Sequence, residues 1–351
     1  MASTPPPSTA LSSIGPVPFK DVAGAGGEGH RGVPPPEEFS GTVAAMPTTN
    51  MLGFKLHRHQ DTWVVDACLT GVLSVQRRFA PRPGDVVLAS PPKCGTTWLK
   101  ALAFAVMARA AYPPSLASNE EHPLLRLNPH ACVPFLEELF TVGQEAKLEL
   151  LPSPRLINTH MHHSLLPPSL TGNPDCKIVY VCREPKDMVV SLWHFAKSIM
   201  PEGSKHTFSD LFEDACKGET PSGPIWDHTL GYWRASKAHP DRVLFLKYEE
   251  MLLDRAGAVR ELARFLGVPF SAAEEAQGMP ADIVGLCSIE TMKGLSANRT
   301  GVAGLLGFKH ESFFRKGVAG DWANHMTLEM ARRFDDIVED KLRGSGLTFK
   351  P

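Results

Sequence analysis

A lysine, a glycine and two threonines lie together where an apolar run meets an apolar helical pattern in residues 83–104. The segment reads PGDVVLASPPKCGTTWLKALAF. A helix that begins after such a turn leaves its first backbone N–H groups without acceptors, and the positive end of its dipole favours an anion. The residues that form this turn are Lys93, Cys94, Gly95, Thr96, Thr97 and Trp98. They predict a loop that binds a phosphate or a sulfate.

The nucleotide-binding P-loop is the main alternative for this turn. Its pattern has four residues between two glycines and a lysine directly after the second glycine. Here Lys93 precedes Gly95, which is the only glycine of the turn. This order disfavours a kinase or an ATPase, although a strand, a turn and a helix would cradle a phosphate in the same way. An ordinary turn with a solvated lysine is disfavoured by the grouping of these residues.

Four short apolar runs predict the buried strands that position this loop. They cover residues 85–90, 155–160, 177–183 and 243–248. Because helical patterns lie between them, we expect an α/β fold, a single domain with a central parallel sheet flanked by helices. Ligands of such sheets bind at the carboxyl ends of the strands, where Ser90, His160 and Arg183 stand.

Helical spacing and capping residues predict where several helices begin. Apolar residues recur every three or four positions from Trp98 to Met107, which is typical of a helix packed on a sheet. Ser209 is the expected cap of a helix that ends at Gly218. A capping box between Ser271 and Glu274 marks the start of another helix.

The first 50 residues differ in composition from the rest of this 351-residue chain. They are rich in Pro, Gly, Ala, Ser and Thr, so we expect a disordered tail over 1–50 and one domain over 51–351. Acidic residues in this stretch argue against a transit peptide, and no secretory apolar segment is present.

Charge and cysteine usage exclude several classes of function. The formal net charge of −2 gives no overall basic surface for nucleic acid. The most apolar stretch, 98–112, is too short to span a bilayer and carries charges, so no membrane is expected. Seven cysteines form no CxxC pair and no metal-ligand spacing, which indicates a reducing compartment and no metal site. We therefore expect a cytoplasmic protein.

From about Phe54 to Phe349 the chain resembles the cytosolic sulfotransferase family, most closely its plant branch. The matching segments, in family order, are PPKCGTTWLK at 91–100, RLINTH at 155–160, KIVYVCREPKDMVVSLWHF at 177–195, LFLKYEEML at 244–252 and FFRKGVAGDWANH at 313–325. The resemblance implies transfer of the sulfuryl group of 3′-phosphoadenosine 5′-phosphosulfate (PAPS) to a hydroxyl or amine of a small acceptor. The loop at Lys93 then becomes a P-loop-like phosphosulfate-binding loop.

The resemblance also implies a role for each matching residue. Lys93 would contact the bridging oxygen, and the backbone of the loop around Gly95 would hold the 5′-phosphate. The adenine and nucleoside would lie against Trp98, Tyr248 and Ser288. The 3′-phosphate would be bound by Arg183, Ser191, Arg315, Lys316 and Gly317. From the residues alone, Arg183 could instead form a surface ion pair with Asp187, and the glycine-rich stretch 301–320 suits a mobile lid.

His160 is the general base that the resemblance implies. An imidazole with a pKa near neutrality can accept a hydroxyl proton. Strand alternation predicts that His160 and His162 face one way and His163 the other. No metal is required, because lysine, arginine and backbone donors can neutralise the charge that develops.

Two departures from the family pattern shape our expectations. Asn158 stands where animal relatives often carry lysine, so that position offers no second cation. The segment after GDW has Ala323 and Arg332 where the dimerisation pattern has lysine and glutamate, and we expect a monomer. Flavonoid, steroid, hydroxyjasmonate and simple phenol acceptors all stay open. The alternatives are a nucleotide-binding relative without activity and a small-molecule kinase.

Overall fold

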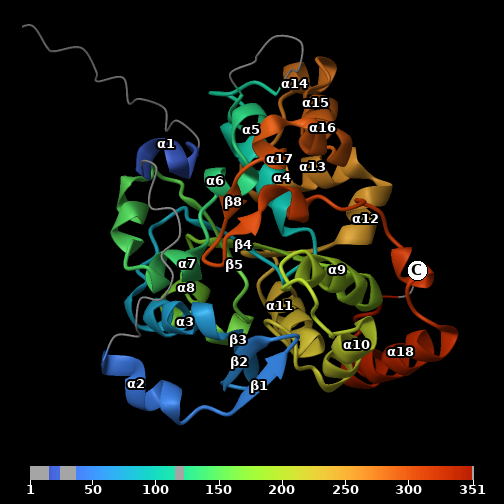
Figure 1. Ribbon diagram of the computed structural model, residues 1–351. Helices are drawn as coiled ribbons and strands as arrows, with labels where there is room; N and C mark the ends of the chain where they lie inside the picture. The colour runs from blue at the N-terminus through green and yellow to red at the C-terminus, as the bar shows by residue number, and fades with distance from the viewer. Residues whose placement is uncertain (1–15, 24–36, 115–121, 350–351) are drawn as a thin grey trace, which may run out of the picture.

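A four-stranded parallel sheet in the order β5-β4-β6-β7 lies at the centre of the computed structural model, which describes residues 16–23, 37–114 and 122–349 (Figure 1). Its strands are β4 (Val86–Ala89), β5 (Leu156–Thr159), β6 (Lys177–Cys182) and β7 (Val243–Lys247). Each lies within one residue of a predicted run. The prediction of an α/β fold with a central parallel sheet is confirmed.

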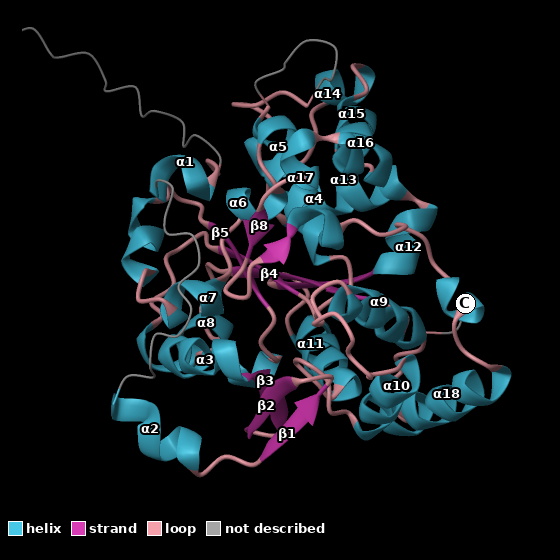
Figure 2. Ribbon diagram, in the orientation of Figure 1, coloured by secondary structure: helices cyan, strands magenta, loops and turns pink. Residues whose placement is uncertain are grey.

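Helices cover both faces of this sheet (Figure 2). Alternate side chains of β4 therefore enter different cores: Val86 and Leu88 pack on one side, and Val87 and Ala89 on the other. Parallel strands that are buried on both faces need such continuous apolar runs.

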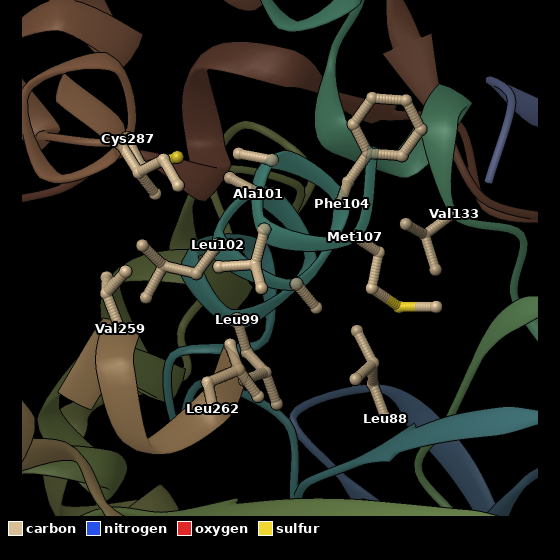
Figure 3. Packing of buried hydrophobic residues seen from close by; sticks show 14 of the residues in the cluster. Leu88, Leu99, Ala101, Leu102, Phe104, Met107, Val133, Val259, Leu262 and Cys287 are labelled. Atoms are coloured by element: carbon tan, nitrogen blue, oxygen red, sulfur yellow. The ribbon is translucent and has the colours of Figure 1, made fainter. Parts of the chain in front are cut away.

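The helix after β4 is the structural base of the predicted phosphate loop. It is α4 (Thr96–Ala108), and it confirms the predicted helix. Figure 3 shows Leu99 and Leu102 packed against Val259 and Leu262 of the neighbouring helix α13 (Arg255–Phe265), with Leu88 of the sheet nearby. A helix that is apolar on nearly all sides must be covered on all sides. Its first turn is thereby held rigidly at the edge of the sheet.

The remaining elements wrap this centre. The helices are α1 (Phe19–Ala23), α2 (Glu37–Ala44), α3 (Asp66–Arg78), α5 (Pro123–Arg126), α6 (Pro129–Cys132), α7 (Leu136–Thr141), α8 (Pro168–Thr171), α9 (Pro185–Lys197), α10 (Phe208–Lys217), α11 (Ile225–Ala238), α12 (Tyr248–Leu253), α14 (Ala272–Ala276), α15 (Met279–Leu286), α16 (Ile289–Gly294), α17 (Ser296–Arg299) and α18 (Leu328–Leu342). Two antiparallel sheets are formed by β1 (Thr48–Met51), β2 (Phe54–His59) and β3 (Thr62–Val65), and by β8 (Val302–Ala303) and β9 (Phe308–Lys309). The sequence patterns did not predict these two sheets, because β1 (TTNM) and β2 (FKLHRH) lack a continuous apolar run and β8 and β9 have only two residues each.

Part of the predicted tail is structured. The elements α1 and α2 lie within residues 1–50 and β1 begins there, so the expectation of disorder is wrong for 16–23 and 37–50. Residues 1–15 and 24–36 lie outside the described part. Phe39 is fully buried, and Phe19 packs on the core. A few apolar side chains are enough to pack a segment against a large existing surface. The average composition of a 50-residue window does not reveal so few residues.

The two predicted caps have different outcomes. The capping box of Ser271 and Glu274 is present at α14. At α10 the cap is Thr207, which forms a box with Asp210, so the prediction of Ser209 as the cap is wrong. That helix ends at Gly218 as predicted, with φ 79°. Both threonine and serine are good caps, and the box with Asp210 decides in favour of Thr207.

Within the described ranges, no helix is long and apolar enough to cross a membrane. The same residues contain no group of three or more His, Cys, Asp or Glu side chains arranged to hold a metal ion.

Candidate active site

One cavity of about 930 Å³ lies at the carboxyl ends of the strands and gathers nearly all of the predicted site residues. Its lining includes Lys93, Gly95, Thr96, Thr97, Trp98, His160, Arg183, Ser191, Tyr248, Ser288, Arg315, Lys316 and Gly317. These residues come from segments that lie far apart in the sequence. Of the predicted set, Cys94 alone does not line the cavity.

The loop between β4 and α4 adopts an unusual backbone conformation. Lys93 has φ 67° and Gly95 has φ 99°. A Cβ atom on Gly95 would lie 2.8 Å from Cδ2 of Tyr248, so only glycine fits there. The N–H groups of Thr96, Thr97 and Trp98, in the first turn of α4, have no intrahelical acceptors. The loop therefore presents backbone donors to the cavity.

Lys93 is a cation without a carboxylate partner in the described part of the chain. Its Nζ lies 3.8 Å from the centroid of the Phe195 ring. Burial, followed by the neighbouring charges of Arg183 and Arg315, lowers the Lys93 pKa to about 7. The charge of a partly buried lysine among other cations is poorly compensated until an anion binds.

Cys94 supports the loop from inside. Its side chain is buried in the core, its N–H donates to the Pro91 carbonyl at 3.4 Å, and burial raises the pKa of its thiol. Thr96 also has a partner, because its Oγ1 lies 2.7 Å from Oγ of Ser90. The hydroxyl of Thr97 is the one that faces a cavity residue, with Nε2 of His130 at 3.1 Å.

Arg183 and Ser191 form a second polar cluster beyond β6. Arg183 is only 6% exposed, and its guanidinium lies 4.8 Å from the centre of the Tyr248 ring. It donates to the Val318 carbonyl at 2.7 Å and lies 3.5 Å from Asp187, but its buried Nε has no partner in the described structure. The ion pair with Asp187 exists, yet it is not at the surface. Ser191 is buried in the following helix α9.

A C-terminal loop lines this side of the cavity and is hydrogen-bonded to α9. The buried carboxylate of Asp187 accepts hydrogen bonds from the N–H groups of Gly320 and Trp322 at 2.7 and 2.8 Å. Arg315 and Lys316 form ion pairs with Asp321. Burial alone would raise the Asp321 pKa, but hydrogen bonds from Lys316 and Arg315 hold it well below its usual range.

Aromatic side chains line the cavity between these clusters. Trp98 and Tyr248 meet edge to face, with ring centroids 5.5 Å apart. Trp98 also packs on the core, so it is both a core residue and a lining residue. Ser288 caps α16, where its Oγ accepts from the N–H of Thr291 at 3.1 Å. A flat ring could lie against the exposed face of Trp98.

His160 is held in the tautomer that a base requires. Its Nδ1 lies 2.6 Å from the Ser90 carbonyl, which can only accept, so Nδ1 carries the proton and Nε2 keeps its lone pair. The Glu137 carboxylate accepts from the His160 N–H at 2.8 Å and fixes the backbone. Burial, opposed by the bond to Ser90 and assisted by Lys100 and Lys93, lowers the His160 pKa to about 3. The ring is therefore neutral.

The predicted alternation of the histidines is wrong. β5 ends at Thr159, so strand geometry does not extend to His162. The Nε2 of His162 lies 2.9 Å from the Ser222 carbonyl, away from the cavity lining. Asn158 also points elsewhere, since its Nδ2 donates to the Leu88 carbonyl at 2.8 Å. It offers the cavity neither charge nor hydroxyl.

The sequence patterns missed the apolar part of the cavity lining, which adjoins the phosphate loop where Phe195 lies against Lys93. Apolar side chains form this part, among them Phe135, Phe195, Leu305, Phe308 and Phe313. Phe19 and Lys20 of α1 add a wall from the expected tail. Lys100, His130 and Glu138 were also missed; a lysine inside the apolar run of α4 was the one available signal.

Comparison with known proteins identifies the family. The family model that describes the sulfotransferase domain matches residues 83–346 of this chain. The chain belongs to the sulfotransferase family. Among its relatives, this sulfotransferase is 42% identical over 317 residues to cytosolic sulfotransferase 1 of Arabidopsis thaliana, covering 89% of this chain and 95% of the relative. It is 44% identical over 298 residues to cytosolic sulfotransferase 7 of the same plant, covering 84% and 90%.

Solved structures agree with this assignment. The sulfotransferase is similar to a putative steroid sulphotransferase of Arabidopsis thaliana, with a TM-score of 0.69, 37% identity and coverage of 88% and 94%. A mouse sulfotransferase complexed with PAP has a TM-score of 0.65, 28% identity and coverage of 83% and 95%. The resemblance that the motifs indicated is confirmed.

Proposed function

We propose that this sulfotransferase transfers the sulfuryl group of PAPS to a hydroxyl of a small organic acceptor. One observation carries the proposal: the free Nε2 of His160 shares a cavity with the anion-binding loop at Lys93. The mouse relative complexed with PAP supports the choice of nucleotide.

The residues present fit a nucleotide with two phosphate groups. The loop at Lys93 offers a cation and backbone donors. At a separate place, Arg183 has a buried Nε that lacks an acceptor. A guanidinium is the natural planar partner of a phosphate. Between these clusters, Trp98 and Tyr248 suit an adenine ring.

The protein's contribution to the reaction is positioning and charge stabilisation. PAPS supplies a sulfuryl group activated by its bond to a phosphate. His160 accepts the hydroxyl proton at Nε2 while the acceptor oxygen forms its bond to sulfur. Lys93 stabilises the negative charge left on the phosphate oxygen when the sulfur–oxygen bond breaks. The proton can enter only at Nε2, because Nδ1 already donates its own proton to the Ser90 carbonyl.

The apolar part of the cavity suits a hydrophobic acceptor, such as a flavonoid, a steroid, a hydroxyjasmonate or a phenol. The relatives are named cytosolic, and we propose the cytoplasm for this protein too. The expected monomer and metal-free catalysis stay predictions.

Calorimetric titration without added metal tests the nucleotide. We expect tight binding of PAP, the 3′-phosphoadenosine 5′-phosphate product, and weak binding of ATP. A preference for Mg-ATP would overturn the proposal and favour a kinase. Binding of PAP without transfer to any acceptor in a broad screen would favour a nucleotide-binding protein without activity.

His160→Ala tests the base. General-base catalysis contributes roughly 10²- to 10⁴-fold, so we expect a loss of turnover in that range. PAP affinity should stay within about threefold, since His160 is not assigned to the nucleotide; calorimetry checks this. Retained turnover would remove His160 from the role of base.

A further inference from the structure

Lys100 is a second lysine at the cavity, and the proposed function does not use it. Burial lowers its pKa to about 7, and the charges of Glu138 and Glu137 oppose that shift. Its side chain comes from α4 and is fully buried, yet it belongs to the cavity lining. Its Nζ donates to the Val133 carbonyl at 3.1 Å and lies 3.2 Å from Nδ1 of His130. Burying a lysine is costly, so a position like this one calls for an explanation.

The hydrogen-bond chemistry gives these contacts a direction. A lysine ammonium only donates, so Nδ1 of His130 accepts from Lys100. The proton of a neutral His130 then lies on Nε2, which donates to Oγ1 of Thr97 at 3.1 Å. With its oxygen occupied as an acceptor, the Thr97 hydroxyl is free to donate its own proton. The neighbouring Thr96 differs, because its hydroxyl is shared with Ser90 inside the protein.

We propose that Lys100 and His130 form a positioning relay that aims the Thr97 hydroxyl as a donor at the 5′-phosphate of the bound nucleotide. This inference rests on the proposed function. When Lys100 is protonated, the relay also places a positive charge beside the site from α4, where Asn158 provides none. Chains of hydrogen bonds polarise one another, so a charge at one end strengthens the donor at the other end.

The surroundings of His130 are built to hold its ring still. Its ring centroid lies 4.3 Å from that of Phe313. Its backbone N–H donates to the Asn128 side chain at 3.0 Å, and Asn128 donates in turn to Asn298 at 2.9 Å. Asn298 donates to the Met292 carbonyl at 2.8 Å. This network joins α6 to the α16–α17 segment, and it fixes the one imidazole that touches both Lys100 and Thr97.

A double-mutant cycle on PAP binding, measured by calorimetry, tests the relay. We expect His130→Phe, which keeps the ring beside Phe313, and Thr97→Val each to weaken binding about tenfold, as loss of a hydrogen bond to a charged group does. The double variant should also lose about tenfold rather than about 100-fold, because both changes remove one interaction. His130→Gln, whose amide can donate to Thr97, should restore most of the affinity.

The control combines His130→Phe with Ser191→Ala, because Ser191 lies in the other phosphate cluster. The effects of these two substitutions on PAP affinity should multiply. Thermal unfolding of every variant checks that each is folded. If His130→Phe does not fold, the PAP affinity of His130→Gln still tests the relay. The relay alone would be overturned if the effects of His130→Phe and Thr97→Val on PAP affinity multiplied. It would also be overturned if His130→Phe left PAP affinity unchanged. A wild-type protein that fails to bind PAP would overturn the proposed function with it.

Discussion

Arg155 and Arg183 stand at opposite ends of the same sheet and have opposite surroundings. Both are buried, with 1% and 6% exposure. Arg155 precedes β5 and binds Asp85 through two hydrogen bonds of 2.9 and 2.6 Å, with a third bond to Glu149 at 3.0 Å. Arg183 follows β6, and its closest carboxylate, Asp187, lies 3.5 Å away while its Nε lacks a partner.

The difference separates a structural charge from a binding charge. At the amino ends of the strands, Arg155 already has the acceptors that its guanidinium can use. At the carboxyl ends, Arg183 and Lys93 lie close enough for their charges to interact, and Lys93 has no carboxylate partner among the described residues. Charged side chains that lack an ion-pair partner are expected where a ligand supplies the opposite charge. Four experiments test this contrast between structural and binding charges.

The largest effect is expected at the structural end. Arg155→Met would leave Asp85 buried without its partner, and breaking a buried pair costs about 3 to 5 kcal/mol of unfolding free energy. Denaturant unfolding measures this loss. The folded fraction should bind PAP as the wild type does, and a selective loss of PAP affinity would contradict the structural role.

Arg183→Met should show the reverse pattern. Loss of a charge-assisted hydrogen bond, about 1.5 to 3 kcal/mol, predicts PAP binding weaker by roughly 10- to 100-fold in calorimetry. Stability should fall far less than in Arg155→Met, because Asp187 keeps its hydrogen bonds from the Gly320 and Trp322 N–H groups when Arg183 is replaced. Equal destabilisation by the two variants would end the distinction between the two arginines.

The pH dependence of PAP affinity tests Lys93. Its pKa is lowered to about 7, so the free protein loses this charge as the pH rises above 7. An anion binds the protonated form, so affinity should fall by up to about tenfold per pH unit between pH 7 and 9. Lys93→Arg stays charged in this range and should give a flatter profile. Parallel profiles would mean that Lys93 does not titrate on binding.

The smallest effect is expected at the apolar part of the cavity. Phe308 lies against Phe195, with ring centroids 4.7 Å apart. Phe308→Leu should raise the KM for the acceptor by about fivefold, since an aromatic pair contributes about 1 kcal/mol. PAP affinity should change less than twofold. A larger effect on PAP affinity than on the KM for the acceptor would contradict a role of Phe308 in acceptor binding.

Local sequence patterns were enough to predict the central sheet and the phosphate loop. Short apolar runs define β4 to β7, and the order of Lys93 and Gly95 separates this loop from a nucleotide-binding P-loop. Both signals are local, because a strand's apolar run and a turn's glycine act within a few residues. The family resemblance placed the remaining residues, including His160, Arg183 and Arg315.

Only the tertiary structure decided which buried polar groups are already paired. Cys94 turns into the core, Thr96 pairs with Ser90, and His162 bonds to Ser222 instead of facing the cavity with His160. The structure also brought Lys100 to His130 and placed Phe19 and Lys20 of α1 in the cavity lining. These outcomes depend on hydrogen-bond partners and packing surfaces that lie far away along the chain, and no local pattern of residues carries that information.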